Sequence, residues 1–236
     1  MGNEGFPNPG VLGAQNSSVG FLEATWRAAF DNAIADEMTG SQTSTDTWRA
    51  GGRATKENPD KENGVWWQTK GFDMFKSFTE WWEANNNWHI WLTPTGDHGI
   101  ELGLFHDFNG VPVRAYADLV CYDQDGVFSV VDFKTGTYMP DSAMQLGLYA
   151  TLIESLFGVR PQRGYYYNAR KAIMEPVTGL DRWTKPVFDE LFTQFQVAIS
   201  HNIYLPNIGM MCGSCGVKEY CYAYSGAIGI DPLGNL

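Results

Sequence analysis

Apolar residues recur with a helical period over the first third of the chain. Residues 18–38 place them on one stripe, and residues 65–84 repeat the spacing with mostly aromatic side chains. We therefore predict two helices, separated by a mobile loop at residues 39–64, where polar residues and glycine replace aliphatic ones. The aromatic residues of the second helix favour burial beneath another layer, with a stacking platform for nucleic-acid bases as the alternative.

From Trp88 onward the period of apolar residues changes to two, which is typical of strands. Several strands joined by turns are predicted, and Asn109-Gly110 is a strong hairpin signal. The predicted strands cover residues 88–92, 100–105, 111–122, 127–134 and 164–168, and the later helices cover 141–156 and 184–201. This order predicts an α/β fold, a mixed sheet flanked by helices.

The chain of 236 residues is long enough for one large domain with a small appendage. We expect three regions, namely an N-terminal helical region at 1–87, a core at 88–205 and a cysteine-containing tail at 206–236. No run approaches the roughly 18 apolar residues of a membrane span, and the first residues do not resemble a secretory signal. We therefore expect a cytoplasmic protein that does not bind membranes.

The formal net charge of −11 is unusual for a protein that binds nucleic acid through its phosphates. Carboxylates that hold divalent metals contribute to such a count, and the charge is also uneven along the chain. Residues 160–185 carry six basic residues against two acidic ones, so a local basic face is expected there.

Two acids and a lysine form the candidate chemical centre. Asp132 and Lys134 are two residues apart on a strand and share a face, and the hairpin brings Asp118, at the end of the preceding strand, beside them. Two carboxylates and the backbone carbonyl of Phe133 can ligate Mg²⁺ or Mn²⁺, and the lysine can position a water and offset charge on a phosphate. A surface salt bridge between strands is the alternative, because an Asp-x-Lys motif alone is common.

Gln145 and Tyr149 lie four residues apart on the predicted helix that follows, so they share one face of it. The rest of that helix is largely apolar, so both polar groups need partners. A DNA phosphate or the water of a metal site would serve, and the alternative is a solvated pair at the surface.

Residues 114–157 resemble the RecB-like branch of the PD-(D/E)xK nucleases. Asp118, Asp132 and Lys134 in VVDFKTG match its acidic and basic positions, and Gln145 and Tyr149 match its QxxxY motif. The resemblance is strongest to the single-domain exonucleases encoded by phages and by CRISPR adaptation loci.

That resemblance implies a restriction-endonuclease-like fold and an Mg²⁺- or Mn²⁺-dependent exonuclease. Its expected substrate is single-stranded DNA ends, in phage recombination and repair or in CRISPR adaptation, with proteins of those processes as partners. It implies that Asp118 and Asp132 bind metal, that Lys134 assists hydrolysis, and that Gln145 and Tyr149 contact DNA or order the site. A phage-encoded protein would act in the cytoplasm of its bacterial host.

Cys212, Cys215 and Cys221 lie close together in the tail, and thiolates at such spacing favour a soft-ligand metal, zinc or an iron–sulfur cluster. The resembled family has this triplet and completes a [4Fe–4S] cluster with an N-terminal cysteine. This sequence has no cysteine before Cys121, which we assign to the core. A missing N-terminal segment, a ligand other than cysteine, a degenerate cluster and three free structural cysteines stay open as explanations.

The family also has a metal-binding histidine on an early helix, and Trp26 or Arg27 stands near that position here. Glu23 or Glu101 are candidate substitutes. These departures, together with the acidic charge, favour an alternative function, a catalytically weakened protein that binds nucleic acid or a partner on the same fold.

Overall fold

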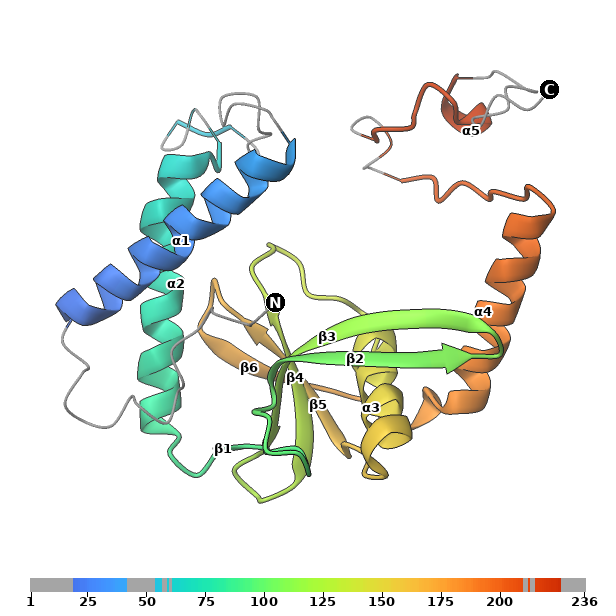
Figure 1. Ribbon diagram of the computed structural model, residues 1–236. Helices are drawn as coiled ribbons and strands as arrows, with labels where there is room; N and C mark the ends of the chain where they lie inside the picture. Colours follow the sequence, from blue (N-terminus) through green and yellow to red (C-terminus); the bar gives the residue numbers. More distant parts are fainter. Residues whose placement is uncertain are drawn as a thin grey trace. The chain divides into compact units, whose positions relative to one another are not determined.

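The computed structural model describes residues 19–41, 54–56, 59, 61–209, 212 and 215–225. These described residues divide into two compact units, one lying within the ranges 1–106 and 114–184 and the other within 107–113 and 185–236. The first unit contains the sheet and its flanking helices (Figure 1). Among the described residues, no helix has the length and apolar character needed to cross a bilayer.

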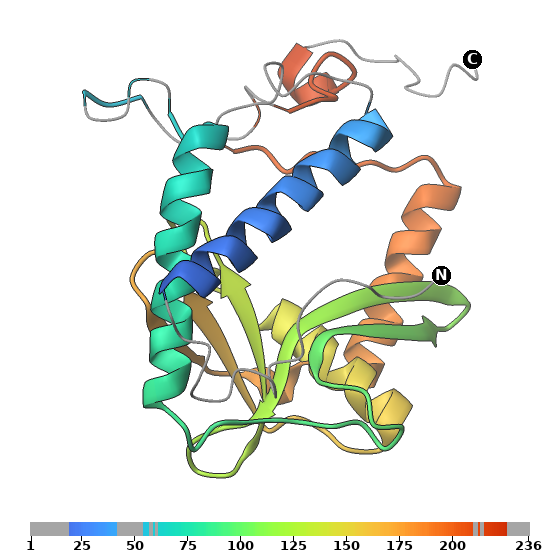
Figure 2. The same ribbon diagram turned by 60° about the vertical axis from the view of Figure 1, so that its left-hand side comes forward.

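The two helices predicted near the N-terminus are confirmed. α1 (Val19–Ser41) and α2 (Gly64–Ala84) cross one another, as Figures 1 and 2 show. Asn63 caps α2, because its side chain accepts a hydrogen bond from the Trp66 amide at 3.0 Å. Most of the predicted loop at 39–64 lies outside the described residues, and α1 continues into its first positions.

The sheet has six strands in the order β1-β3-β4-β5-β6, with β2 paired to β3. Pairing is antiparallel except between β4 and β5, which are parallel and joined through α3, so the sheet is mixed as predicted. The bounds are β1 (His89–Ile90), β2 (Ile100–Phe108), β3 (Val111–Tyr122), β4 (Phe128–Lys134), α3 (Met144–Phe157), β5 (Arg163–Asn168), β6 (Ile173–Val177) and the short 3₁₀ helix η3 (Leu180–Arg182).

Two predicted elements need correction, and two observed elements were not predicted. The strand predicted at 88–92 is only two residues long. The backbone of Val120 on β3 bonds to both Trp91 and Gly99, so the chain leading into β2 pairs with this edge of β3 where β1 was expected to continue. The helix predicted from residue 141 begins at Met144. The strand β6 and the helix η3 have no counterpart in the prediction.

The Asn109-Gly110 turn is confirmed. Both residues have positive φ angles, 52° and 85°, as a two-residue hairpin of the I′ type requires. In the second unit, the ring of Phe108 beside this turn lies 6.1 Å from that of Phe188 and 5.2 Å from that of Phe192 on α4 (Lys185–Ser200). The remaining helix, α5 (Tyr222–Ser225), belongs to the tail.

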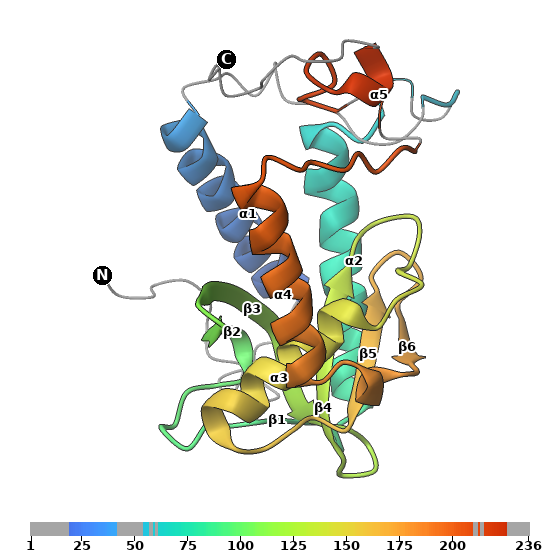
Figure 3. The same ribbon diagram turned by 90° about the vertical axis from the view of Figure 1, so that its right-hand side faces the viewer.

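Helices cover both faces of the sheet, α2 on one side and α3 on the other (Figure 3). Leu119, Cys121 and Val131 join Tyr165 and Tyr167 in a buried cluster on the α2 side. Cys121 is fully buried there, which confirms its assignment to the core. Because side chains alternate along a strand, Asp118, Asp132 and Lys134 belong to the other parity, that of the face covered by α3.

Candidate active site

The two acids of the predicted centre face one another where β3 and β4 separate. The paired register of the strands ends at Leu119 and Val131, so Asp118 and Asp132 are the next residues beyond it. Asp118 lies inside β3, four residues before its last residue, and not at the strand end as predicted. Its Oδ2 accepts a hydrogen bond from the Phe133 amide at 2.7 Å, which replaces the strand pairing lost there.

Asp132 is the most enclosed member of the site, with 2% of its surface exposed. The Lys134 ammonium lies 2.5 Å from its Oδ2, and the Gln145 amide donates to its Oδ1 at 2.6 Å. The Tyr149 hydroxyl lies 3.4 Å from the same Oδ1. Every donor near this carboxylate therefore comes from the residues that the sequence motifs select.

Gln145 joins the lysine to the carboxylate. Its Oε1 accepts a hydrogen bond from Lys134 Nζ at 2.8 Å, while its Nε2 donates to Asp132 and, at 2.7 Å, to the Tyr149 hydroxyl. The lysine also lies 5.4 Å from the centre of the Tyr166 ring. Lys134 is thus fixed by an anion, an amide oxygen and an aromatic face.

The position of α3 over the site depends on Gly147, which lies between Gln145 and Tyr149 on that helix. A Cβ atom at Gly147 would lie 2.2 Å from Cβ of Trp183, so only glycine allows this approach. Thr151 and Arg160 both hydrogen-bond the Trp183 carbonyl, at 2.9 and 2.7 Å. The segment around η3 therefore holds α3 at the distance that Gln145 needs.

Burial raises the pKa of Asp118 to about 6, and the negative charges of Asp132 and Glu101 add to this, while the Phe133 amide hydrogen bond opposes it. Burial likewise raises the pKa of Tyr149 to about 12, so its hydroxyl keeps its proton at neutral pH. The site therefore concentrates negative charge in a partly dehydrated place, where a cation would be stabilised.

The residues present fit a divalent metal ion. Two carboxylates meet here, and among the described residues a single ammonium pairs with them, that of Lys134 at 2.5 Å from the buried Asp132 Oδ2. The Phe133 carbonyl points to the same side of β4 as the Phe133 amide, toward Asp118. No group of three His, Cys, Asp or Glu side chains gathers among the described residues, so the fit rests on two carboxylates and one carbonyl.

A hollow of about 300 Å³ opens beside Asp118 on the α2 side of the sheet. Trp26, near the position of the family's histidine, lines it together with Glu101. Arg27 and Glu23 instead pair with one another on the exposed surface of α1, at 2.8 Å. Of the two proposed substitutes for the histidine, Glu101 is thus the one that lies near Asp118.

An arginine that was not predicted from the sequence braces the segment after Lys134. Arg170 donates to the Thr135 carbonyl at 2.6 Å and to both oxygens of Glu62, at 3.0 and 2.8 Å. Its guanidinium also lies over the rings of Trp66 and Trp67. These partners are far apart in sequence, so local patterns do not predict the contact. The one related prediction was the basic stretch at 160–185, which contains Arg170.

That basic stretch does not form the free basic face that was expected. Arg160 pairs with Glu154, Arg163 with Asp123 and Asp125, Arg170 with Glu62, and Lys185 with Asp189. Four of its six basic residues are therefore neutralised by acids from other parts of the chain or from the same helix.

The tail cysteines remain a prediction. Cys212 and Cys221 are half-buried and Cys215 is exposed, and the Cys212 sulfur accepts a hydrogen bond from the Gly209 amide at 3.2 Å. Within the described part of the tail, the three thiols are not gathered around a common point.

Comparisons with known proteins identify the family of the chain. The model of the PD-(D/E)XK nuclease superfamily matches residues 21–222. Gene 69 protein of Mycobacterium phage D29 is 30% identical over 192 residues, covering 72% of this chain and 69% of that protein. A structure from Eubacterium rectale, described provisionally as an exonuclease, matches 91% of this chain and 75% of its own at 10% identity, with a TM-score of 0.46.

The family match spans α1, the sheet, α3 and most of the tail, and so includes every residue of the site described above. The mixed sheet flanked by helices, with its two acids and lysine where β3 and β4 separate, is the restriction-endonuclease-like fold of that family. The chain therefore belongs to the PD-(D/E)XK nuclease superfamily.

Proposed function

We propose that this protein is a metal-dependent deoxyribonuclease that removes nucleotides from single-stranded DNA ends. The observation that carries the proposal is the arrangement around Asp132, a buried carboxylate with one oxygen hydrogen-bonded by Gln145 and the other paired with the Lys134 ammonium at 2.5 Å. Asp118 supplies a second carboxylate beside it, so one ammonium faces two acids and a divalent cation would balance the remaining charge.

Asp118, Asp132 and the Phe133 carbonyl would hold Mg²⁺ or Mn²⁺. When bound, such an ion polarises the scissile phosphate and lowers the pKa of a water molecule. Hydrolysis adds that water across one P–O bond, so the attacking water loses a proton and the leaving oxygen gains one.

Lys134 places a positive charge where negative charge builds up on the phosphoryl oxygens. Gln145 keeps it there, because it binds the ammonium through its oxygen and the Asp132 carboxylate through its nitrogen. Tyr149 orients Gln145 in turn, since its hydroxyl accepts from the same amide nitrogen. Gln145 and Tyr149 are therefore positioning residues for the lysine and the acid.

The phage relative supports a role in phage DNA metabolism, with recombination and repair proteins as partners, and a CRISPR adaptation complex is the other setting. The tail cysteines Cys212, Cys215 and Cys221 would bind a [4Fe–4S] cluster together with a fourth ligand. Iron analysis and visible absorbance of protein purified without oxygen test this directly. A colourless protein free of iron would overturn the cluster.

The nuclease proposal is tested by incubating the protein with Mn²⁺ and end-labelled single-stranded DNA. We expect nucleotide release by the wild type and a loss of roughly 100-fold or more in Lys134→Ala, as for removal of one transition-state donor. Lys76→Ala is the matched control, because Lys76 pairs with Glu80 on the exposed side of α2. Equal rates in the two lysine variants would contradict the proposal.

One observation favours the second candidate, a nucleic-acid-binding or partner-binding protein without activity. The described residues present two acidic side chains at the site and no third metal-binding side chain in range. Calorimetric titration with Mn²⁺ separates the two functions. Binding that disappears in Asp118→Asn supports the nuclease, and no binding to the wild type supports the second candidate.

A further inference from the structure

The hollow beside Asp118 has aromatic walls supplied by one face of α2. The hollow is lined by residues that follow one another at helical spacing on α2, namely Trp67, Met74, Phe75 and Phe78. Trp26 of α1 closes another side of it. Gly71 makes room for that indole, since a Cβ atom there would lie 2.4 Å from the Trp26 ring. The Trp26 indole nitrogen donates to the Gln68 carbonyl at 3.0 Å, which fixes this wall.

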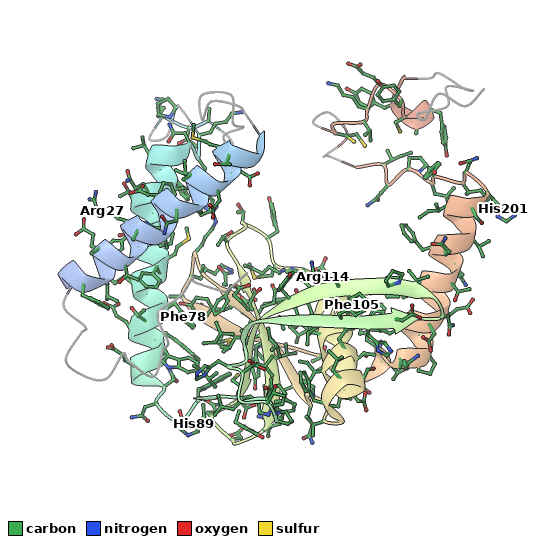
Figure 4. The ribbon with its side chains drawn as sticks, viewed as in Figure 1. Arg27, Phe78, His89, Phe105, Arg114 and His201 are labelled. Carbon is green, nitrogen blue, oxygen red and sulfur yellow. The ribbon has the colours of Figure 1, made fainter. Side chains whose placement is uncertain are left out.

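The aromatic residues of α2 divide into two groups. Phe78 packs edge-on against Phe133 and Tyr167, with ring centres 4.8 and 5.0 Å apart, and Figure 4 shows it projecting from α2 toward the sheet. Trp67 and Phe75 lie further toward the start of the helix and keep part of their surface exposed. All three rings are half-buried and line the hollow, and Phe75 also stacks on Trp26 with ring centres 6.0 Å apart, so packing within the protein leaves part of each ring uncovered.

A buried polar group also borders the hollow. Tyr167 lines it and is 1% exposed, yet its hydroxyl has no hydrogen-bond partner among the described residues. Buried hydroxyl groups in folded proteins nearly always have a partner. Burial raises the pKa of Tyr167 to about 12, so the group stays protonated and can donate. A ligand with an acceptor atom would satisfy it.

We propose that this hollow binds the nucleobase of a nucleotide next to the scissile phosphate, stacked on Trp67 and Phe75 and hydrogen-bonded by the Tyr167 hydroxyl. The inference rests on the proposed function, because Asp118 belongs both to the metal site and to the wall of the hollow. A base held there would place its own phosphate beside Asp118.

Size and chemistry favour a base. The hollow is about twice the roughly 150 Å³ cavity that accepts benzene, so it has room for one or two fused rings. Stacking on aromatic side chains tolerates any base, which suits an enzyme that degrades DNA of any sequence. A base can enter only when it is unpaired, so the hollow also gives a physical reason for preferring single-stranded ends.

The test measures binding of short single-stranded oligonucleotides that differ only in the position of one abasic nucleotide. It uses the full chain carrying Lys134→Ala, so that DNA stays intact, with Mg²⁺ present. We expect one abasic position near the bound end to weaken affinity by roughly 5- to 150-fold, the range for loss of one stacked base. Adding Trp67→Ala or Tyr167→Phe should reduce that difference, while Phe72→Ala, on α2 but outside the hollow, should preserve it.

Thermal unfolding without DNA serves as the second readout. Tyr167→Phe removes a hydroxyl for which the described part of the chain offers no partner, so we expect unchanged or higher stability together with weaker binding of the intact base. A destabilised Tyr167→Phe protein would show that another segment of the chain fills the hollow, and would overturn the proposal. So would equal affinity for all abasic oligonucleotides.

Hydrolysis by the wild type, measured in parallel, keeps the two proposals distinct. Release of nucleotides without any abasic effect refutes the base site and leaves the nuclease intact. An abasic effect without hydrolysis supports the base site and refutes the nuclease.

Discussion

Replacing Asp118 by asparagine is expected to stabilise the protein when no metal is present. The asparagine keeps an oxygen for the Phe133 amide, so the hydrogen bond of 2.7 Å is preserved while the charge is removed. The cause is the raised pKa of Asp118, which reflects burial first and the neighbouring acids Asp132 and Glu101 next. An ionised carboxylate in this place opposes folding.

The magnitude follows from the pKa difference. A rise from the ordinary value of 3.8 to about 6 corresponds to about 3 kcal/mol in the free energy of unfolding. Asp118 is partly exposed, and solvent screening reduces the effect, so we expect about 1 to 2 kcal/mol.

The pH dependence has a definite sign. Well below pH 3.8 the carboxyl is protonated in both folded and unfolded chains, so the charge no longer distinguishes aspartate from asparagine. As pH rises from 4 through about 6 the folded wild type must give up a proton that it binds more tightly than the unfolded chain, so wild-type stability falls relative to Asp118→Asn.

Urea unfolding at pH 4.5 and pH 8 in EDTA measures the difference in the free energy of unfolding between the wild type and Asp118→Asn. With Mg²⁺ at pH 8 the wild type should become the more stable protein, because bound metal stabilises only the wild type. Asp125→Asn is the control, since Asp125 pairs with Arg163 at the exposed turn between β3 and β4. If Asp118→Asn is less stable than the wild type at pH 8 in EDTA, the reasoning about the buried charge fails.

Three further substitutions test the positioning of the site. Gln145→Leu should lower metal affinity in calorimetry and the rate in the nuclease assay by roughly 10- to 100-fold, as loss of a hydrogen bond that supports a metal ligand does. An unchanged metal affinity would refute the positioning role of Gln145. Gly147→Ala should destabilise the fold by about 1–3 kcal/mol in urea, because the new methyl group overlaps Trp183; a stability gain, as helix propensity alone predicts, would contradict the packing. Arg170→Lys cannot keep both bonds to its carboxylate and the bond to the Thr135 carbonyl, so we expect a loss of about 1–3 kcal/mol, and equal urea midpoints would show the brace to be unimportant.

The centre of the site could be read from local sequence because its residues are close along the chain. Asp132 and Lys134 follow from strand alternation, and Gln145 with Tyr149 from helical spacing, so a short stretch of about 30 residues contains most of the site. The hydrogen bonds that join them confirm that the four side chains meet, although their catalytic roles remain a prediction.

What the sequence could not predict depends on distant partners. Arg170 meets Glu62, 108 residues away, and the hollow beside Asp118 needs α1, α2 and the sheet together. Asp118 was placed at a strand end because periodicity does not reveal where two paired strands separate. The short β1 has a similar cause, since competition for the edge of β3 is a property of the sheet and not of any one segment.

The dependence of nucleotide release on Mn²⁺ concentration shows whether the two carboxylates hold a metal needed for hydrolysis. We expect single-stranded DNA to be degraded at a rate that rises with Mn²⁺ and saturates in the wild type and in Asp125→Asn. Asp132→Asn, which loses the charge of the most buried acid of the site, should show no metal-dependent release at any concentration. Release without a divalent metal, or a saturating curve in Asp132→Asn equal to that of the wild type, would contradict it.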